Sequence, residues 1–118
     1  MSNEQLAISS EELTAADYQK LAMRTASGKC YDLANAALGL AGEAGEVADL
    51  IKKHLYHDHR LDAVRVAEEL GDLLWYIVLA ANICGYSLSE VMAKNIDKLR
   101  KRYPEGFDPE RSVHRAES

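Results

Sequence analysis

Apolar residues recur every three or four positions along most of the chain, which is the period of an amphipathic α-helix. The clearest stripe lies in the segment 32–57, where the spacing alternates between four and three: Leu33, Ala37, Leu40, Ala44, Val47 and Ile51. No segment shows the period-two alternation of β-branched and aromatic residues that is typical of strands. Both prolines come after residue 103, so none interrupts a helix before that point. The pattern predicts an all-α chain.

Capping residues divide this pattern into four predicted helices, over residues 14–27, 32–57, 62–84 and 87–102. Thr14 and Ser87 each precede an acidic residue by three positions, as in a capping box. Asp62 is a favourable N-cap residue, and Gly28 and Gly85 are typical of the position after a helix C-terminus. The four predicted helices indicate a four-helix-bundle-like architecture.

The third predicted helix is apolar on every side over residues 73–81, with the sequence LLWYIVLAA. A helix of this kind needs cover all round. Two arrangements supply it, and the sequence leaves both open. Either this helix is the centre of the chain's own bundle, or one face meets another subunit in a homo-oligomer, a dimer or a tetramer.

The length and charge of the chain narrow the choice of function. With 118 residues we expect one domain over 1–118, a helical core over about 14–103, and loosely held polar tails over 1–9 and 105–118. Acidic residues outnumber basic ones by 19 to 14, which disfavours a surface for a nucleic-acid polymer. The longest apolar run, 73–81, is about half the length of a membrane span, so we expect no membrane segment.

The cysteines and the first residues indicate the compartment. Cys30 and Cys84 are too few for a disulfide framework, and we expect both to be small buried thiols. Residues 1–10 have neither the basic nor the apolar region of a signal peptide. Both features predict a cytoplasmic protein in a reducing environment.

Two pairs of acidic residues are the main chemical feature. Glu43 and Glu46 are three positions apart beside the apolar stripe of the second helix, and Glu69 and Asp72 repeat this spacing on the third. Residues three apart share one side of a helix, so antiparallel packing through the stripes brings the carboxylates together. Like charges at short range raise one another's pKa, and a hard divalent cation removes that cost. Glu68 also neighbours Asp72, which leaves the exact membership open.

Glycines interrupt both helices close to these acids, at Gly39, Gly42, Gly45 and Gly71. Each costs about 0.8–1 kcal/mol relative to alanine inside a helix. Close helix packing is the favoured explanation, and room for a ligand near the backbone is the other.

Other readings of these residues were weighed on the sequence. The acidic pairs can be solvated surface of a non-catalytic helical interaction module. A histidine cluster at 54–59 can bind a transition metal, although no further ligand group is apparent. A ferritin-like di-iron bundle requires Glu-x-x-His pairs, and the sequence contains none. Trp75 and Tyr76 can stack on a base, but aromatic residues in an apolar run are more often core.

A longer pattern then becomes recognisable. Glu43-x-x-Glu46 is followed, after 22 residues, by Glu69-x-x-Asp72 within EELGDLL, then by KNIDKLRKRYP at 94–104 and by Gly106-Phe107. Over residues 30–108 the chain resembles the all-α nucleoside triphosphate pyrophosphohydrolases of the MazG type. Many members carry an additional acidic residue where this chain has Gly42, so the resemblance supplies no fifth carboxylate.

The resemblance implies an enzyme of the nucleotide pool. Its activity would be hydrolysis of a (deoxy)nucleoside triphosphate to the monophosphate and pyrophosphate, by water attack at the α-phosphate. Glu43, Glu46, Glu69 and Asp72 would be the catalytic carboxylates that hold Mg²⁺, with Mn²⁺ as a possible substitute. Lys98, Arg102 and Asn95 would face the phosphates, and Tyr76 would contact the nucleotide. The related phosphoribosyl-ATP pyrophosphohydrolase activity stays open, as do house-cleaning and pool-control roles.

Overall fold

The structure is a computed structural model, and it describes residues 8–115. These residues form five α-helices and one 3₁₀ turn, and no β-strand occurs among them. The elements are α1 (Ala15–Met23), η2 (Gly28–Cys30), α2 (Leu33–Tyr56), α3 (Ala63–Ile83), α4 (Leu88–Arg102) and α5 (Pro109–Val113). The predicted all-α fold is confirmed.

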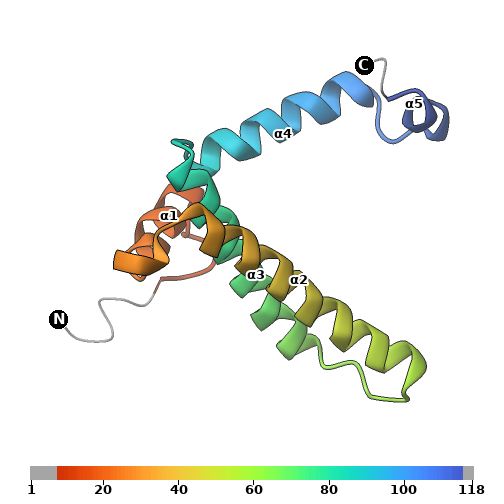
Figure 1. Ribbon diagram of the computed structural model, residues 1–118. Helices are drawn as coiled ribbons and strands as arrows, with labels where there is room; N and C mark the ends of the chain where they lie inside the picture. Colours follow the sequence, from red (N-terminus) through yellow and green to blue (C-terminus); the bar gives the residue numbers. More distant parts are fainter. Residues whose placement is uncertain (1–7, 116–118) are drawn as a thin grey trace.

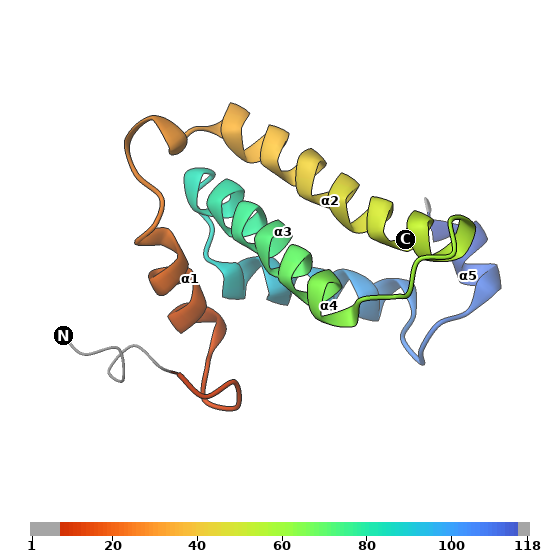
Figure 2. The same ribbon diagram turned by 90° about the horizontal axis from the view of Figure 1, so that it is seen from below.

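An antiparallel hairpin of α2 and α3 is the largest unit of the fold. The two helices run side by side in both views (Figures 1 and 2), and they make the most extensive contact between any two elements. Asp32 and Asp62 cap their N-termini by accepting hydrogen bonds from backbone amides three residues on, at 2.7 and 3.1 Å. Local capping and the apolar stripes therefore fix both the ends and the register of this hairpin.

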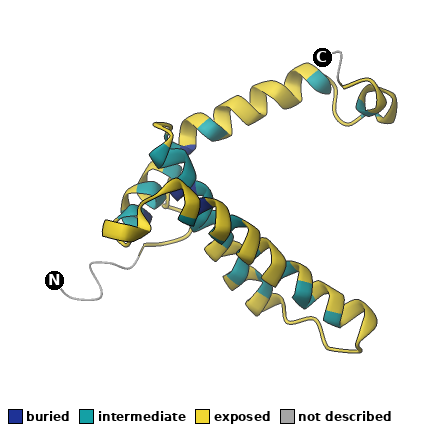
Figure 3. Cartoon of the chain, in the orientation of Figure 1, coloured by how far each residue is buried: buried dark blue, intermediate teal, exposed yellow. Residues whose placement is uncertain are grey.

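The core lies at one end of the hairpin, where α1, α2, α3 and the start of α4 meet (Figure 3). Its fully buried side chains come from all four helices: Ala22, Ala36, Val78, Leu79 and Leu88. Further along the hairpin the side chains are half-buried or exposed. The apolar run 73–81 is thus only partly covered within one chain, because it is fully buried at Val78 and Leu79 alone.

Polar side chains tie α1 to the other helices. The Gln19 amide nitrogen donates to Asn82 Oδ1 at 3.0 Å, while Gln19 Oε1 accepts from the Leu88 amide at 2.8 Å. Trp75 Nε1 donates to the Ala22 carbonyl at 3.1 Å and to Thr25 Oγ1 at 2.8 Å. These bonds use Trp75 as a structural residue, in agreement with the reading of this aromatic as core.

The first helix ends earlier than expected. The capping box of Thr14 and Asp17 is confirmed, but α1 stops at Met23 and Gly28 begins η2. The Ala22 carbonyl accepts from the Thr25 hydroxyl at 2.6 Å as well as from Trp75. Because these side chains occupy that carbonyl, the chain leaves the helix there.

Two further expectations differ from the structure. The prediction of buried thiols is wrong, since Cys30 and Cys84 are both exposed. Cys30 lies in η2 and Cys84 caps the end of α3, so both occupy helix ends at the surface. Residues 109–113 form the short helix α5 in a segment expected to be loose, and the predicted tails at 1–7 and 116–118 lie outside the described residues.

No single helix among residues 8–115 is long and apolar enough to cross a membrane; only α3 and α4 taken together pass on length and composition, and a bend of 97° separates them.

The glycines of the hairpin divide into two kinds. A Cβ atom at Gly39 would overlap the Tyr76 ring, whereas one at Gly42, Gly45 or Gly71 would meet nothing. Close packing therefore explains Gly39, where α2 passes beneath an aromatic ring of α3. The other three face open space within the chain.

This contrast predicts opposite effects of alanine at two glycines of α2. Gly39→Ala should lower the free energy of unfolding by about 1–3 kcal/mol, because Tyr76 must move. Gly45→Ala should raise it by about 0.5–1 kcal/mol, because the residue is helical and its surroundings are open. Urea denaturation of both variants checks this, and equal stability of the two would contradict the assigned contact.

Candidate metal centre

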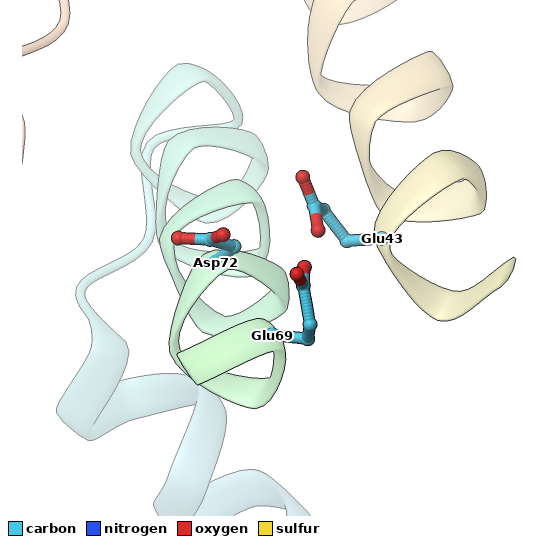
Figure 4. A group of neighbouring side chains, drawn as sticks. All are labelled: Glu43, Glu69 and Asp72. Carbon is cyan, nitrogen blue, oxygen red and sulfur yellow. The ribbon is translucent and has the colours of Figure 1, made fainter. Parts of the chain in front are cut away.

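Three carboxylates converge between the helices of the hairpin. Glu43 extends from α2 towards Glu69 and Asp72 on α3 (Figure 4). One oxygen of each lies within 4.8 Å of the others. The arrangement follows from the three-residue spacing of Glu69 and Asp72, which places both on one side of α3, opposite the α2 stripe.

Glu43 is the most constrained of the three. It is half-buried, and its Oε2 atom is buried without a hydrogen-bond partner. A hydrogen bond with Glu69, which only a protonated Glu43 can donate, raises its pKa most; desolvation and then the charges of Glu69, Asp72 and Glu46 raise the pKa further. A buried carboxylate oxygen that lacks a donor and faces other acids is a position suited to a cation.

The first helix borders the same cluster. Burial raises the pKa of Tyr18 on α1, and the charge of Asp72 raises it further. The sequence gave no reason to associate Tyr18 with the acids, because the two lie more than 50 residues apart. Only the packing of α1 across the hairpin brings them together.

Glu46 and Glu68 lie outside the converging group. Both are exposed, and neither belongs to the set of oxygens within 4.8 Å. The charge of Glu46 nevertheless acts on Glu43, one helical turn away. The structure thus unites three of the four predicted carboxylates, and Glu46 stays a predicted ligand.

The donor set indicates the kind of cation. Carboxylate oxygens without nitrogen or sulfur suit Mg²⁺, Mn²⁺ or Ca²⁺ better than zinc. Among residues 8–115, no second cluster of histidine, cysteine or acidic side chains has this geometry. The histidine cluster does not gather as a metal site, since His54 Nδ1 instead lies 2.9 Å from the His59 carbonyl oxygen.

The four residues predicted to bind substrate fall into two groups. Tyr76 is half-buried on α3, one turn after Asp72, and covers Gly39. Asn95, Lys98 and Arg102 lie on α4, which packs on α1 and α3 and makes no comparable contact with α2. Figure 1 shows α4 running away from the hairpin, so this chain does not bring them to its own carboxylates.

The site can now be compared with known proteins. Residues 32–107, more than half of the chain, match the family described as the MazG nucleotide pyrophosphohydrolase domain. The chain belongs to this family. The MazG domain therefore includes α2, α3 and α4 with all the carboxylates. Membership supports nucleotide pyrophosphohydrolase activity in general terms and metal dependence of that activity.

A phage protein is also similar to the chain. The Gene 37 protein of Mycobacterium phage L5 is 38% identical over 81 residues, which cover 63% of this chain and 68% of that protein. No solved structure matches. The name of the phage protein carries no functional information, so the family match and the site geometry bear the functional argument.

Repulsion within the carboxylate cluster predicts an unusual stability effect. In chelator at neutral pH, Glu43→Gln should raise the melting temperature by a few degrees, because it removes one charge from a crowded group. A raised pKa in the folded state means that ionised Glu43 opposes folding. The gain should therefore shrink as the pH falls and wild-type Glu43 takes up a proton.

Glu68→Gln is the matched control for this measurement. It removes the same charge from an exposed position outside the cluster, so its melting temperature should stay near that of the wild type at every pH. An equal effect of both variants would show that the cluster is not specially strained.

Proposed function

We propose that the protein hydrolyses a nucleoside triphosphate to the nucleoside monophosphate and pyrophosphate. The observation that carries this proposal is the convergence of Glu43, Glu69 and Asp72 around a buried oxygen without a donor, within a MazG domain. In the reaction, a water oxygen bonds to the α-phosphorus while the bond from that phosphorus to the bridging oxygen breaks. Pyrophosphate leaves, and the proton of the water passes to a carboxylate and then to solvent.

The residues fit a divalent metal, Mg²⁺ with Mn²⁺ as a substitute. Glu43, Glu69 and Asp72 would hold it, and exposed Glu46 would complete the set by turning inwards from the next turn of α2. When bound, such a cation lowers the pKa of water and offsets phosphate charge. The carboxylates hold the site together and one of them accepts the proton, which a carboxylate next to other acids does readily because its pKa is raised.

Four further side chains are proposed to bind the substrate. Lys98 and Arg102 are cations suited to phosphate oxygens, and Asn95 offers an amide donor one turn from them. Tyr76 lies beside the carboxylates and presents an aromatic ring to a nucleotide. Their position is the reason to expect a homo-oligomer, dimer or tetramer, since α4 does not reach the cluster of its own chain. We place the reaction in the control or house-cleaning of a cytoplasmic nucleotide pool.

The reaction type can be tested with isotopically labelled water. The protein is incubated with Mg²⁺ and a panel of common and modified (deoxy)nucleoside triphosphates, with phosphoribosyl-ATP as a further substrate. Attack at the α-phosphorus places ¹⁸O from water in the monophosphate and leaves the pyrophosphate unlabelled. Label in the pyrophosphate, or release of inorganic phosphate alone, would contradict the proposed attack.

Substitution of the cluster should remove this activity. Glu69→Gln should lower kcat/KM by about 100-fold or more, because it weakens the cation site at the reacting phosphate. Glu68→Gln, its exposed neighbour, should stay within about twofold of the wild type, since the side chain lies outside the cluster. Turnover by Glu69→Gln at the wild-type rate would remove the carboxylates from the reaction.

Cation binding is measured separately by thermal unfolding. A cation held only by the folded protein stabilises it by about 2.7 kcal/mol at one hundred times its Kd. Millimolar Mg²⁺ should therefore raise the melting temperature of the wild type and of Glu68→Gln, but not that of Asp72→Asn. An unchanged melting temperature of the wild type would contradict the metal assignment.

A further inference from the structure

The fourth long helix leaves its apolar side uncovered. In α4 only Leu88 is buried, while Met92, Ile96 and Leu99 follow it at helical spacing and are 51%, 46% and 41% exposed. These four residues lie on one side of the helix and form a continuous stripe, the α4 stripe. The bend of 97° between α3 and α4 carries this stripe away from the hairpin.

The stripe continues into an apolar hollow at the end of α4. Tyr103 and Phe107 lie with their ring centroids 5.3 Å apart, and Phe107 is 74% exposed. With Ile96 and Leu99 they line an open hollow of about 490 Å³. Nothing from the described part of the chain fills it, although it is large enough for several apolar side chains of a partner.

The accessible surface is too large for a folded monomer. A monomer of this mass exposes about 6,400 Å², whereas this chain exposes 9089 Å². The residues outside the described range account for at most about 1,500 Å² of the excess, even as fully extended chain. More than about 1,000 Å² remains, and a stable interface needs about 800 Å² from each partner. A second copy would cover this amount.

Charge indicates how the copies fit together. Lys94, Lys98 and Arg102 recur every four residues along one edge of the α4 stripe, and none pairs with an acid in the described part of the chain. The ion pairs within residues 8–115 join Asp49 to Lys52 and Lys53, which leaves the carboxylate cluster without a cationic partner. One chain therefore carries a cationic edge and an acidic cluster that cannot meet each other.

We propose that α4 is an arm that completes a second copy of the chain. Its stripe packs on the partner's α2–α3 hairpin, and its cationic edge lies at the partner's carboxylate cluster. In a two-fold dimer each chain gives one arm and receives one, so both sites are complete. This inference rests on the proposed function for the role of the cations, but the docking of the stripe does not depend on it.

The docking surface is tested by molecular mass in solution. Wild type should have at least twice the chain mass of 13.1 kDa. Ile96→Lys places a charge in the stripe and should shift the protein to monomer, whereas Ala93→Lys adds the same charge on another side of α4 and should not. Circular dichroism establishes that both variants are helical. A monomeric wild type, or an oligomeric Ile96→Lys, would overturn the proposal, and so would dissociation by both variants.

The shared site is tested by mixing two inactive variants. Glu69→Gln lacks a carboxylate, and the double variant Lys98→Ala with Arg102→Ala lacks the cations. In a mixed dimer one site then receives intact carboxylates from one chain and intact cations from the other. Co-expression in equal amounts should restore about a quarter of the wild-type activity, because half of the dimers are mixed and each has one intact site.

The outcomes separate this inference from the proposed function. Absence of recovery in a mixed dimer, with an active wild type, would overturn the shared site and leave the hydrolase assignment standing. Full activity of the cation variant alone would overturn it too. If the wild type hydrolyses no triphosphate, the proposed function fails, while the mass of Ile96→Lys against Ala93→Lys still decides the docking of α4.

Discussion

Repulsion between carboxylates that the hairpin forces together is the interaction on which the rest of the structure depends. Glu43, Glu69 and Asp72 lie within 4.8 Å because the apolar stripes of α2 and α3 pack against each other, not because the acids attract. The raised pKa of Glu43 records that cost. A site that opposes folding when empty has a strong affinity for positive charge, whether from a metal ion or from the cations of another chain.

Local sequence signals predicted most of the fold and the centre of the site. N-caps at Thr14, Asp32, Asp62 and Ser87 begin the four long helices, since a cap acts over three residues and can be read directly from the sequence. The three-residue spacing of the acids, combined with two stripes, placed Glu43, Glu69 and Asp72 together. Gly39 also packs closely with another helix, as its position in a helix suggested.

The features that the sequence did not reveal depend on contacts between distant segments. The end of α1 depends on Trp75, which lies some 50 residues away, and the proximity of Tyr18 to Asp72 depends on where α1 crosses the hairpin. Glu46 differs from Glu43 only by its place on the helix surface. The direction of α4 follows from the turn at Cys84–Ser87, and what covers the stripe lies outside a single chain on our proposal. A periodic pattern shows that a face is apolar without showing what covers it.

The central claim is that these three carboxylates form one cation site. Anomalous X-ray scattering from crystals soaked in Mn²⁺ tests it most directly, because the signal locates the metal without reference to activity. We predict one strong peak between α2 and α3, at about 2.1–2.3 Å from carboxylate oxygens of Glu43, Glu69 and Asp72. Carboxylates turned apart into solvent, with no peak between them, would contradict the account.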